Sequence, residues 1–125
     1  MADRSVLLVL IVRDVGLRST LVARLSLAGG DLITASQPHD PVLERKRLRD
    51  AVMVIDEETI AIQPAGWIET VLDDPRWRAI VVLTWQPAAS DAGTNRPRLI
   101  HVERDNAAKA ITALVHQWRD EPVGG

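Results

Sequence analysis

The sequence predicts an α/β fold: one doubly wound domain with a five-stranded parallel sheet and helices on both faces. Strand-like apolar runs alternate with segments of helical periodicity along the 125 residues. Three runs (residues 6–12, 51–55 and 79–83) are apolar throughout, as expected of strands covered on both faces. Hydrophobic residues make up 46% and charged residues 26% of the chain, so a core can form. We expect a single domain over 1–125, with about 5–120 ordered and 121–125 as a frayed tail.

The first half of the chain predicts two strands and two helices. Residues 6–12 form the first strand, and Asp14 caps a helix that Gly29 and Gly30 end. Residues 32–35 form a short second strand. Asp40 and Pro41 begin a second helix, whose basic residues up to Arg49 we interpret as a solvated face. The apolar stripe of the first helix consists of Leu17, Leu21, Val22, Leu25 and Ala28.

The second half continues the alternation. Residues 51–55 form a strand that ends at Asp56, and residues 79–83 form one that ends at Thr84. The helix between these strands has an apolar stripe at Trp67, Ile68, Val71 and Leu72. Breakers within 85–97 predict that a fourth helix is short or absent. After a strand at 99–102, Asp105 or Asn106 caps the last helix, whose inward stripe is Ile111, Leu114, Val115 and Trp118.

Composition excludes several kinds of function. The net charge of -2 disfavours nucleic acid as a partner, and the absence of Cys excludes disulfides, thiol catalysis and thiolate metal sites. The longest apolar run has seven residues, too few to cross a membrane, so we expect a cytoplasmic protein with no membrane partner. The three histidines (His39, His101 and His116) lack the spacing of a helical metal-ligand pair.

Sites in such sheets form at the carboxyl ends of the strands, which identifies the residues to consider. The first strand–helix turn has one glycine, Gly16, and no phosphate-binding lysine, so nucleotide binding is disfavoured. No Gly-x-Ser-x-Gly elbow occurs, and we predict no enzymatic activity. The strand-end residues are Arg13, Asp14, Asp56, Glu57, Glu58, Thr84, Trp85, Glu103, Arg104 and Asp105.

Three stretches, in order, resemble the receiver domain of bacterial response regulators. The first helix reads Arg18-x-x-Leu21-x-x-x-Leu25-x-x-x-Gly29, and the later stretches are AVMVIDEE and AIVVLT. The resemblance covers nearly the whole chain and implies a flavodoxin-like, receiver-like fold. It also implies that Asp56 occupies the phosphoacceptor position and Thr84 the position of the family's hydroxyl residue.

The departures from the family pattern lie at the site itself. The acidic pair that holds a divalent metal aligns with Val12 and Arg13, or with Arg13 and Asp14, so at least one acid is missing. Trp85 follows the hydroxyl residue where receivers have a small residue, and it could cover the phosphoryl pocket. Either Arg104 or Glu103 replaces the family lysine; we favour Arg104, which places His101 at the aromatic switch position.

Arg13 suggests how a degenerate site could be stabilised. We expect its guanidinium to pair with Asp56 and stand in for the missing metal, because a buried carboxylate without a partner is costly. The alternative is that Asp56 is solvated at the strand end and that Arg13 points to water.

Three functions follow as hypotheses. The first is a pseudo-receiver that signals through protein contacts without metal or cofactor. Its partner would be a histidine kinase, an output protein or a second copy, and the last helix (Lys109, Gln117 and Arg119) would supply the contact surface. The second is a working phosphoacceptor on Asp56 in a phosphorelay, with Mg²⁺ held by Asp14, Asp56, Glu57 or Glu58. The third is a small-ligand or nucleotide-binding α/β domain.

Overall fold

The chain folds around a five-stranded parallel sheet with strand order β2-β1-β3-β4-β5, as a computed structural model shows. The structure describes residues 6–29, 31–36, 51–85 and 98–120. For residues 119 and 120 it describes the backbone only. The strands are β1 (Leu7–Ile11), β2 (Asp31–Thr34), β3 (Ala51–Asp56), β4 (Trp77–Thr84) and β5 (Leu99–Glu103). The predicted α/β class and the parallel flavodoxin-like sheet are confirmed.

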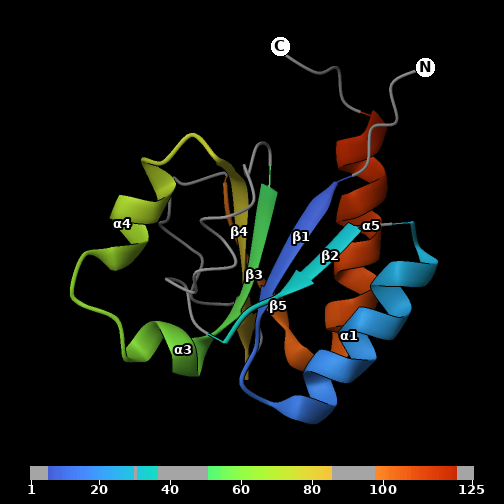
Figure 1. The fold of residues 1–125 in the computed structure, drawn as a ribbon, viewed down its shortest axis with the longest axis horizontal. Coiled ribbons are helices and arrows are strands. Elements are labelled where there is room, and N and C mark those ends of the chain that lie inside the picture. The colour runs from blue at the N-terminus through green and yellow to red at the C-terminus, as the bar shows by residue number, and fades with distance from the viewer. Residues whose placement is uncertain (1–5, 30, 37–50, 86–97, 121–125) are drawn as a thin grey trace.

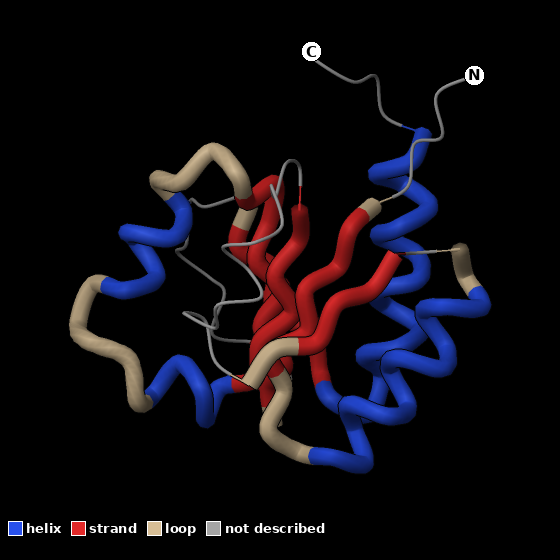
Figure 2. Tube along the Cα trace, viewed as in Figure 1, coloured by secondary structure: helices blue, strands red, loops and turns tan. Residues whose placement is uncertain are grey.

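Helices cover both faces of the sheet (Figures 1 and 2). One face carries α1 and α5, which contact each other, and the other carries α3 and α4. The helices are α1 (Val15–Leu27), α3 (Glu57–Ala61), α4 (Trp67–Leu72) and α5 (Ala107–Asp120), with a 3₁₀ turn, η2, at Arg104–Asn106. Within the described residues, no helix is long and apolar enough to cross a membrane.

The two faces of β3 show why an uninterrupted apolar run suits this sheet. Val52 and Val54 pack with α1 and α5, whereas Met53 and Ile55 pack on the side of α3 and α4. Successive side chains of a strand point to opposite faces, so coverage of both faces requires apolar residues at every position. Every residue of β3 is buried.

Local signals fix the ends of α1. The Asp14 carboxylate accepts a hydrogen bond from the backbone N–H of Leu17 at 3.1 Å, as an N-cap should. Gly29 lies just beyond the C-cap with φ of 91°, a left-handed conformation that glycine adopts without strain. Leu21 and Leu25 of the predicted stripe are fully buried.

The prediction for the last helix is also confirmed. Ile111, Val115 and Trp118 of α5 are buried against the sheet and α1, and Leu114 is partly buried. Trp118 is therefore a core residue.

Other predictions need adjustment or lie outside the described residues. The prediction missed α3, a five-residue helix that follows β3 directly and begins after Asp56. The predicted helix from Asp40 to Arg49, the irregular stretch 86–97, His39 and the 121–125 tail lie outside the described residues.

Candidate functional site

The residues selected by the strand-end rule lie at one edge of the sheet, which we call the carboxyl pole. It consists of the last residues of β3 and β4 and of the residues that follow β1, β3, β4 and β5, at the bottom of Figure 1. The parallel register brings these strand ends to the same edge, since Asp56 pairs with Leu83 and Thr84 pairs with Glu103. Arg13, Asp14, Asp56, Glu57, Glu58, Thr84, Trp85 and Arg104 all belong to this pole.

Asp56 is buried, and both of its carboxylate oxygens are engaged by backbone amides. One oxygen accepts the N–H of Thr59 at 2.9 Å and so caps α3. The other accepts the N–H of Arg13 at 2.7 Å, which links the ends of β1 and β3. Only 1% of Asp56 is exposed, so its carboxylate serves as a structural acceptor within the fold.

The expected side-chain pair between Arg13 and Asp56 is wrong, although the two residues do touch. The contact runs through the Arg13 backbone, and the Arg13 side chain is exposed. No ion pair joins the two residues in the described part of the chain. Backbone amides provide the compensation that we assigned to the guanidinium, because hydrogen bonds to a carboxylate offset part of its burial cost.

A second cluster, built from Glu58, Trp85 and Arg104, lies beside Asp56. The indole N–H of Trp85 donates to Glu58 Oε2 at 2.7 Å, and Arg104 forms a hydrogen-bonded ion pair with Glu58 Oε1. The Arg104 guanidinium carbon lies 3.8 Å from the centre of the Trp85 ring, a cation–π geometry. The three side chains therefore hold one another in place.

Glu57 attaches the Trp85 backbone to the same pole. Its Oε1 accepts the backbone N–H of Trp85 at 3.0 Å. Trp85 is thus held through both its backbone and its ring, yet 64% of the residue remains exposed. Its ring lies over Arg104.

The environment of Glu58 favours its ionised form. Partial burial alone would raise the pKa of the Glu58 carboxyl. Hydrogen bonds from its own backbone N–H, from Trp85 and from Arg104, together with the charge of Arg104, outweigh that effect and lower the pKa. Glu58 therefore remains a carboxylate that can hold both partners at neutral pH.

The other predicted residues are placed as follows. Of the two candidates for the position of the family lysine, Arg104 is buried and belongs to the cluster with Glu58 and Trp85, whereas Glu103 is exposed. The Thr84 hydroxyl donates to the Val102 carbonyl at 3.2 Å. His101 lies within β5, opposite Val82 of β4, and lines a pocket on the α3/α4 side. No hydrogen bond or ion pair joins Asp56 to Arg104 within the described residues.

The carboxylates considered as Mg²⁺ ligands do not fit a metal site as they are arranged. Asp14 caps α1, Asp56 accepts two backbone amides, and Glu58 is bound by Trp85 and Arg104. No group of three or more acidic or histidine side chains converges anywhere in the described segments. Glu57, the fourth candidate, accepts the backbone N–H of Trp85. The described carboxylates therefore do not gather around one point, where a magnesium ion could bind several oxygens at once.

Among the residues that the structure describes, two buried polar atoms at this pole have no hydrogen-bond partner, namely Arg104 Nε and Thr59 Oγ1. An unsatisfied buried donor costs roughly 1–3 kcal/mol.

Sequence reasoning treated Glu57 and Glu58 only as metal ligands and missed their contacts with Trp85 and Arg104. The available signal was an acidic pair after one strand and an arginine after another, at the same edge of the sheet. Charge complementarity between strand ends could have suggested the ion pair, but not the stacking of Trp85 on Arg104.

No family model matches the chain, and neither a curated protein nor a solved structure matches it.

Proposed function

We propose that this chain is an atypical receiver-like signalling domain that acts through protein contacts, without metal-dependent phosphorylation of Asp56. It would act in the cytoplasm, with a histidine kinase, an output protein or a second copy as partner. The sheet order and the strand-end positions of Asp56, Thr84 and Arg104 support a receiver-like arrangement.

The observation that carries the proposal is the state of Asp56. Phosphoryl transfer to a carboxylate requires an accessible oxygen, and a cation must neutralise the charge that develops. Both oxygens of Asp56 already accept backbone amides, and the residue is almost completely buried. Arg104, the nearby cation, is already bound by other partners, since Glu58 forms an ion pair with it and Trp85 stacks on it.

The contact surface has two candidates. Lys109 and Gln117 of α5 are exposed, while the side chain of Arg119 lies outside the described residues. Trp85 is the second candidate, because exposed aromatic side chains that are held rigidly are enriched at the centres of interfaces. We favour Trp85, since its ring is oriented by Glu58 and Arg104 before any partner arrives.

A proton–nitrogen NMR titration tests the proposal. Magnesium is added first and beryllofluoride, a phosphoryl mimic, second, to the wild type and to Asp56→Asn. We expect the amide signals of Asp56, Thr84 and Arg104, and the indole signal of Trp85, to stay in place in both proteins. The Asn variant is the matched control, because its side chain has nearly the same shape but cannot form the acyl-phosphate mimic.

The opposite result would support the phosphoacceptor hypothesis. Saturable shifts of those signals in the wild type, lost in Asp56→Asn, would mean that the Asp56 carboxylate opens to accept the mimic. The proposal of a phosphorylation-independent domain would then be wrong.

A further inference from the structure

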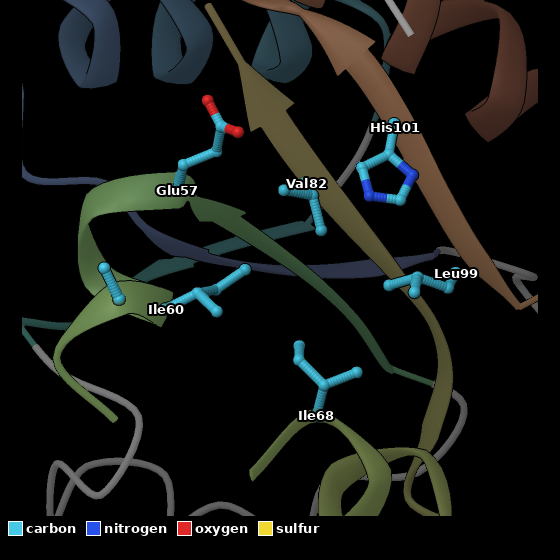
Figure 3. A pocket seen from close by; sticks show the side chains of 7 residues that line it. Glu57, Ile60, Ile68, Val82, Leu99 and His101 are labelled. Atoms are coloured by element: carbon cyan, nitrogen blue, oxygen red, sulfur yellow. The ribbon is translucent and has the colours of Figure 1, made fainter. Parts of the chain in front are cut away.

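A pocket of about 420 Å³ lies on the α3/α4 side of the sheet, and Glu57, which also accepts the backbone N–H of Trp85, forms part of its lining. Its floor is formed by β4 and β5, and its walls come from α3 and α4 (Figure 3). Its volume falls in the usual range of small-molecule sites, roughly 300–1,000 Å³. Among the described residues, the pocket is lined by Glu57, Ile60, Ala61, Ile68, Val82, Leu99 and His101.

Most of the lining is apolar. Val82 and Leu99 lie on neighbouring strands, and Ile60 and Ile68 reach toward them from the two helices (Figure 3). These branched side chains can surround an aromatic ring or a compact aliphatic group, which gains free energy by leaving water. The pocket therefore suits the apolar body of a ligand.

Two polar side chains make one end of the pocket polar. Figure 3 shows Glu57 and His101 at the same end, one on α3 and the other on β5. Glu57 is exposed and uses Oε1 for Trp85, so further acceptor capacity remains on its carboxylate. No ion pair to Glu57 occurs within the described residues. An acidic group in this position selects a cation.

We propose that this pocket binds a small amphipathic cation, with its apolar body between Ile60, Val82 and Leu99 and its ammonium group on Glu57. This inference does not rest on the proposed signalling function, because it does not involve Asp56; the two proposals share only the contact between Glu57 and the backbone of Trp85.

Glu57 also provides a way to observe binding. Its carboxylate holds the backbone N–H of Trp85, so a cation that draws on Glu57 changes the environment of Trp85. Occupation of the pocket would therefore be seen both at its lining residues and at the backbone amide of Trp85.

The test is an NMR titration with 2-phenylethylammonium, which combines an aromatic ring with a primary ammonium group. We expect saturable shifts at Ile60, Val82, Leu99 and His101, accompanied by a shift of the Trp85 backbone amide signal. 3-Phenylpropionate carries a carboxylate in place of the ammonium and should bind far more weakly, because Glu57 repels it.

Variants locate the site. Glu57→Gln should weaken 2-phenylethylammonium binding roughly three- to tenfold, a range that allows for solvent screening of an exposed carboxylate. Glu103→Gln makes the same charge change at an exposed residue outside the pocket, and should leave the affinity unchanged. Ala61→Phe fills the pocket from an exposed position on its rim and should abolish binding.

Three results would overturn the proposal: absence of saturable shifts, equal affinity for the ammonium and carboxylate probes, or equal weakening by Glu57→Gln and Glu103→Gln. Concentration-dependent shifts of the same residues without a probe would mean that a second copy fills the pocket, and would also overturn it. Whether beryllofluoride shifts any NMR signal does not affect these outcomes, so this proposal and the proposed function can fail separately.

Discussion

Two arginines, at opposite ends of the sheet, are held in different ways. At the amino ends of β4 and β5, the guanidinium of Arg98 donates to the carbonyls of Leu72, Trp77 and Arg78 at 2.6, 2.5 and 3.4 Å. At the carboxyl pole, Arg104 is held by the Glu58 carboxylate and the Trp85 ring. Carbonyls do not titrate, whereas a carboxylate can lose its charge.

The difference separates a fixed part of the molecule from a part that can change. Arg98 ties the end of α4 to the first residues of β4, and its acceptors are main-chain carbonyls rather than an acidic side chain. The contacts of Arg104 depend on the ionisation of Glu58 and on the position of an exposed tryptophan. Functional change is therefore expected at the carboxyl pole.

Asp56→Ala should produce the largest loss of stability. It leaves the backbone N–H groups of Arg13 and Thr59 without their acceptor and removes the N-cap of α3, at a cost of about 3 kcal/mol. Urea unfolding, followed by tryptophan fluorescence, measures the change. Asp56→Asn keeps one oxygen and should lose about half as much. A loss below about 1 kcal/mol for the Ala variant would contradict the structural role of the carboxylate.

Arg98→Ala should produce the second-largest loss of stability. It removes three hydrogen bonds to main-chain carbonyls in a partly buried setting, and we expect a loss of roughly 2 kcal/mol that stays constant between pH 7 and pH 3, the range in which the contribution of Glu58 is lost. The same unfolding experiment at several pH values checks both the size and the constancy. If the loss varied strongly across that range, the contrast between the two arginines would fail.

Glu58→Gln should have the smallest effect, about 1 kcal/mol at pH 7, because 43% of the Glu58 side chain is exposed. Its distinguishing feature is pH dependence. The folded pKa of Glu58 lies below its ordinary value of 4.5, so its contribution is complete above that value and is lost as pH falls through the folded pKa.

The difference between Glu58→Gln and the wild type should therefore shrink as the solution is acidified below about pH 4.5. Asp74 also has a lowered pKa, owing to hydrogen bonds from the Arg76 side chain and backbone and to the Arg76 charge, and it adds a similar loss to both proteins. The comparison of variant with wild type cancels the Asp74 contribution. A difference that is unchanged at pH 3 would show that the ionisation of Glu58 does not hold the cluster.

Sequence patterns predicted the sheet well because its strands carry a strong and local signal. Uninterrupted apolar runs located β1, β3 and β4, and the Asp14 cap and Gly29 located α1. The short helix α3 was missed, because five residues offer too little periodicity and its main signal is the capping role of Asp56.

The site was predicted only as a set of residues. The strand-end rule identified Asp56, Trp85 and Arg104 because parallel strands present their carboxyl ends at one edge. It could not identify their partners, since these depend on rotamers and on backbone donors that have no sequence signature. The Arg13 contact shows this limit, because the expected residue does contact Asp56, but through its amide.

The position of β1 between β2 and β3 has a consequence for how the chain folds. Leu7 pairs with Asp31 on one side and with Ala51 on the other. The second pairing must close a loop of about forty residues, which carries an entropic penalty before any contact compensates for it. A nascent or truncated chain that ends before β3 would expose one apolar edge of β1, where unpaired amides and carbonyls can recruit a second chain.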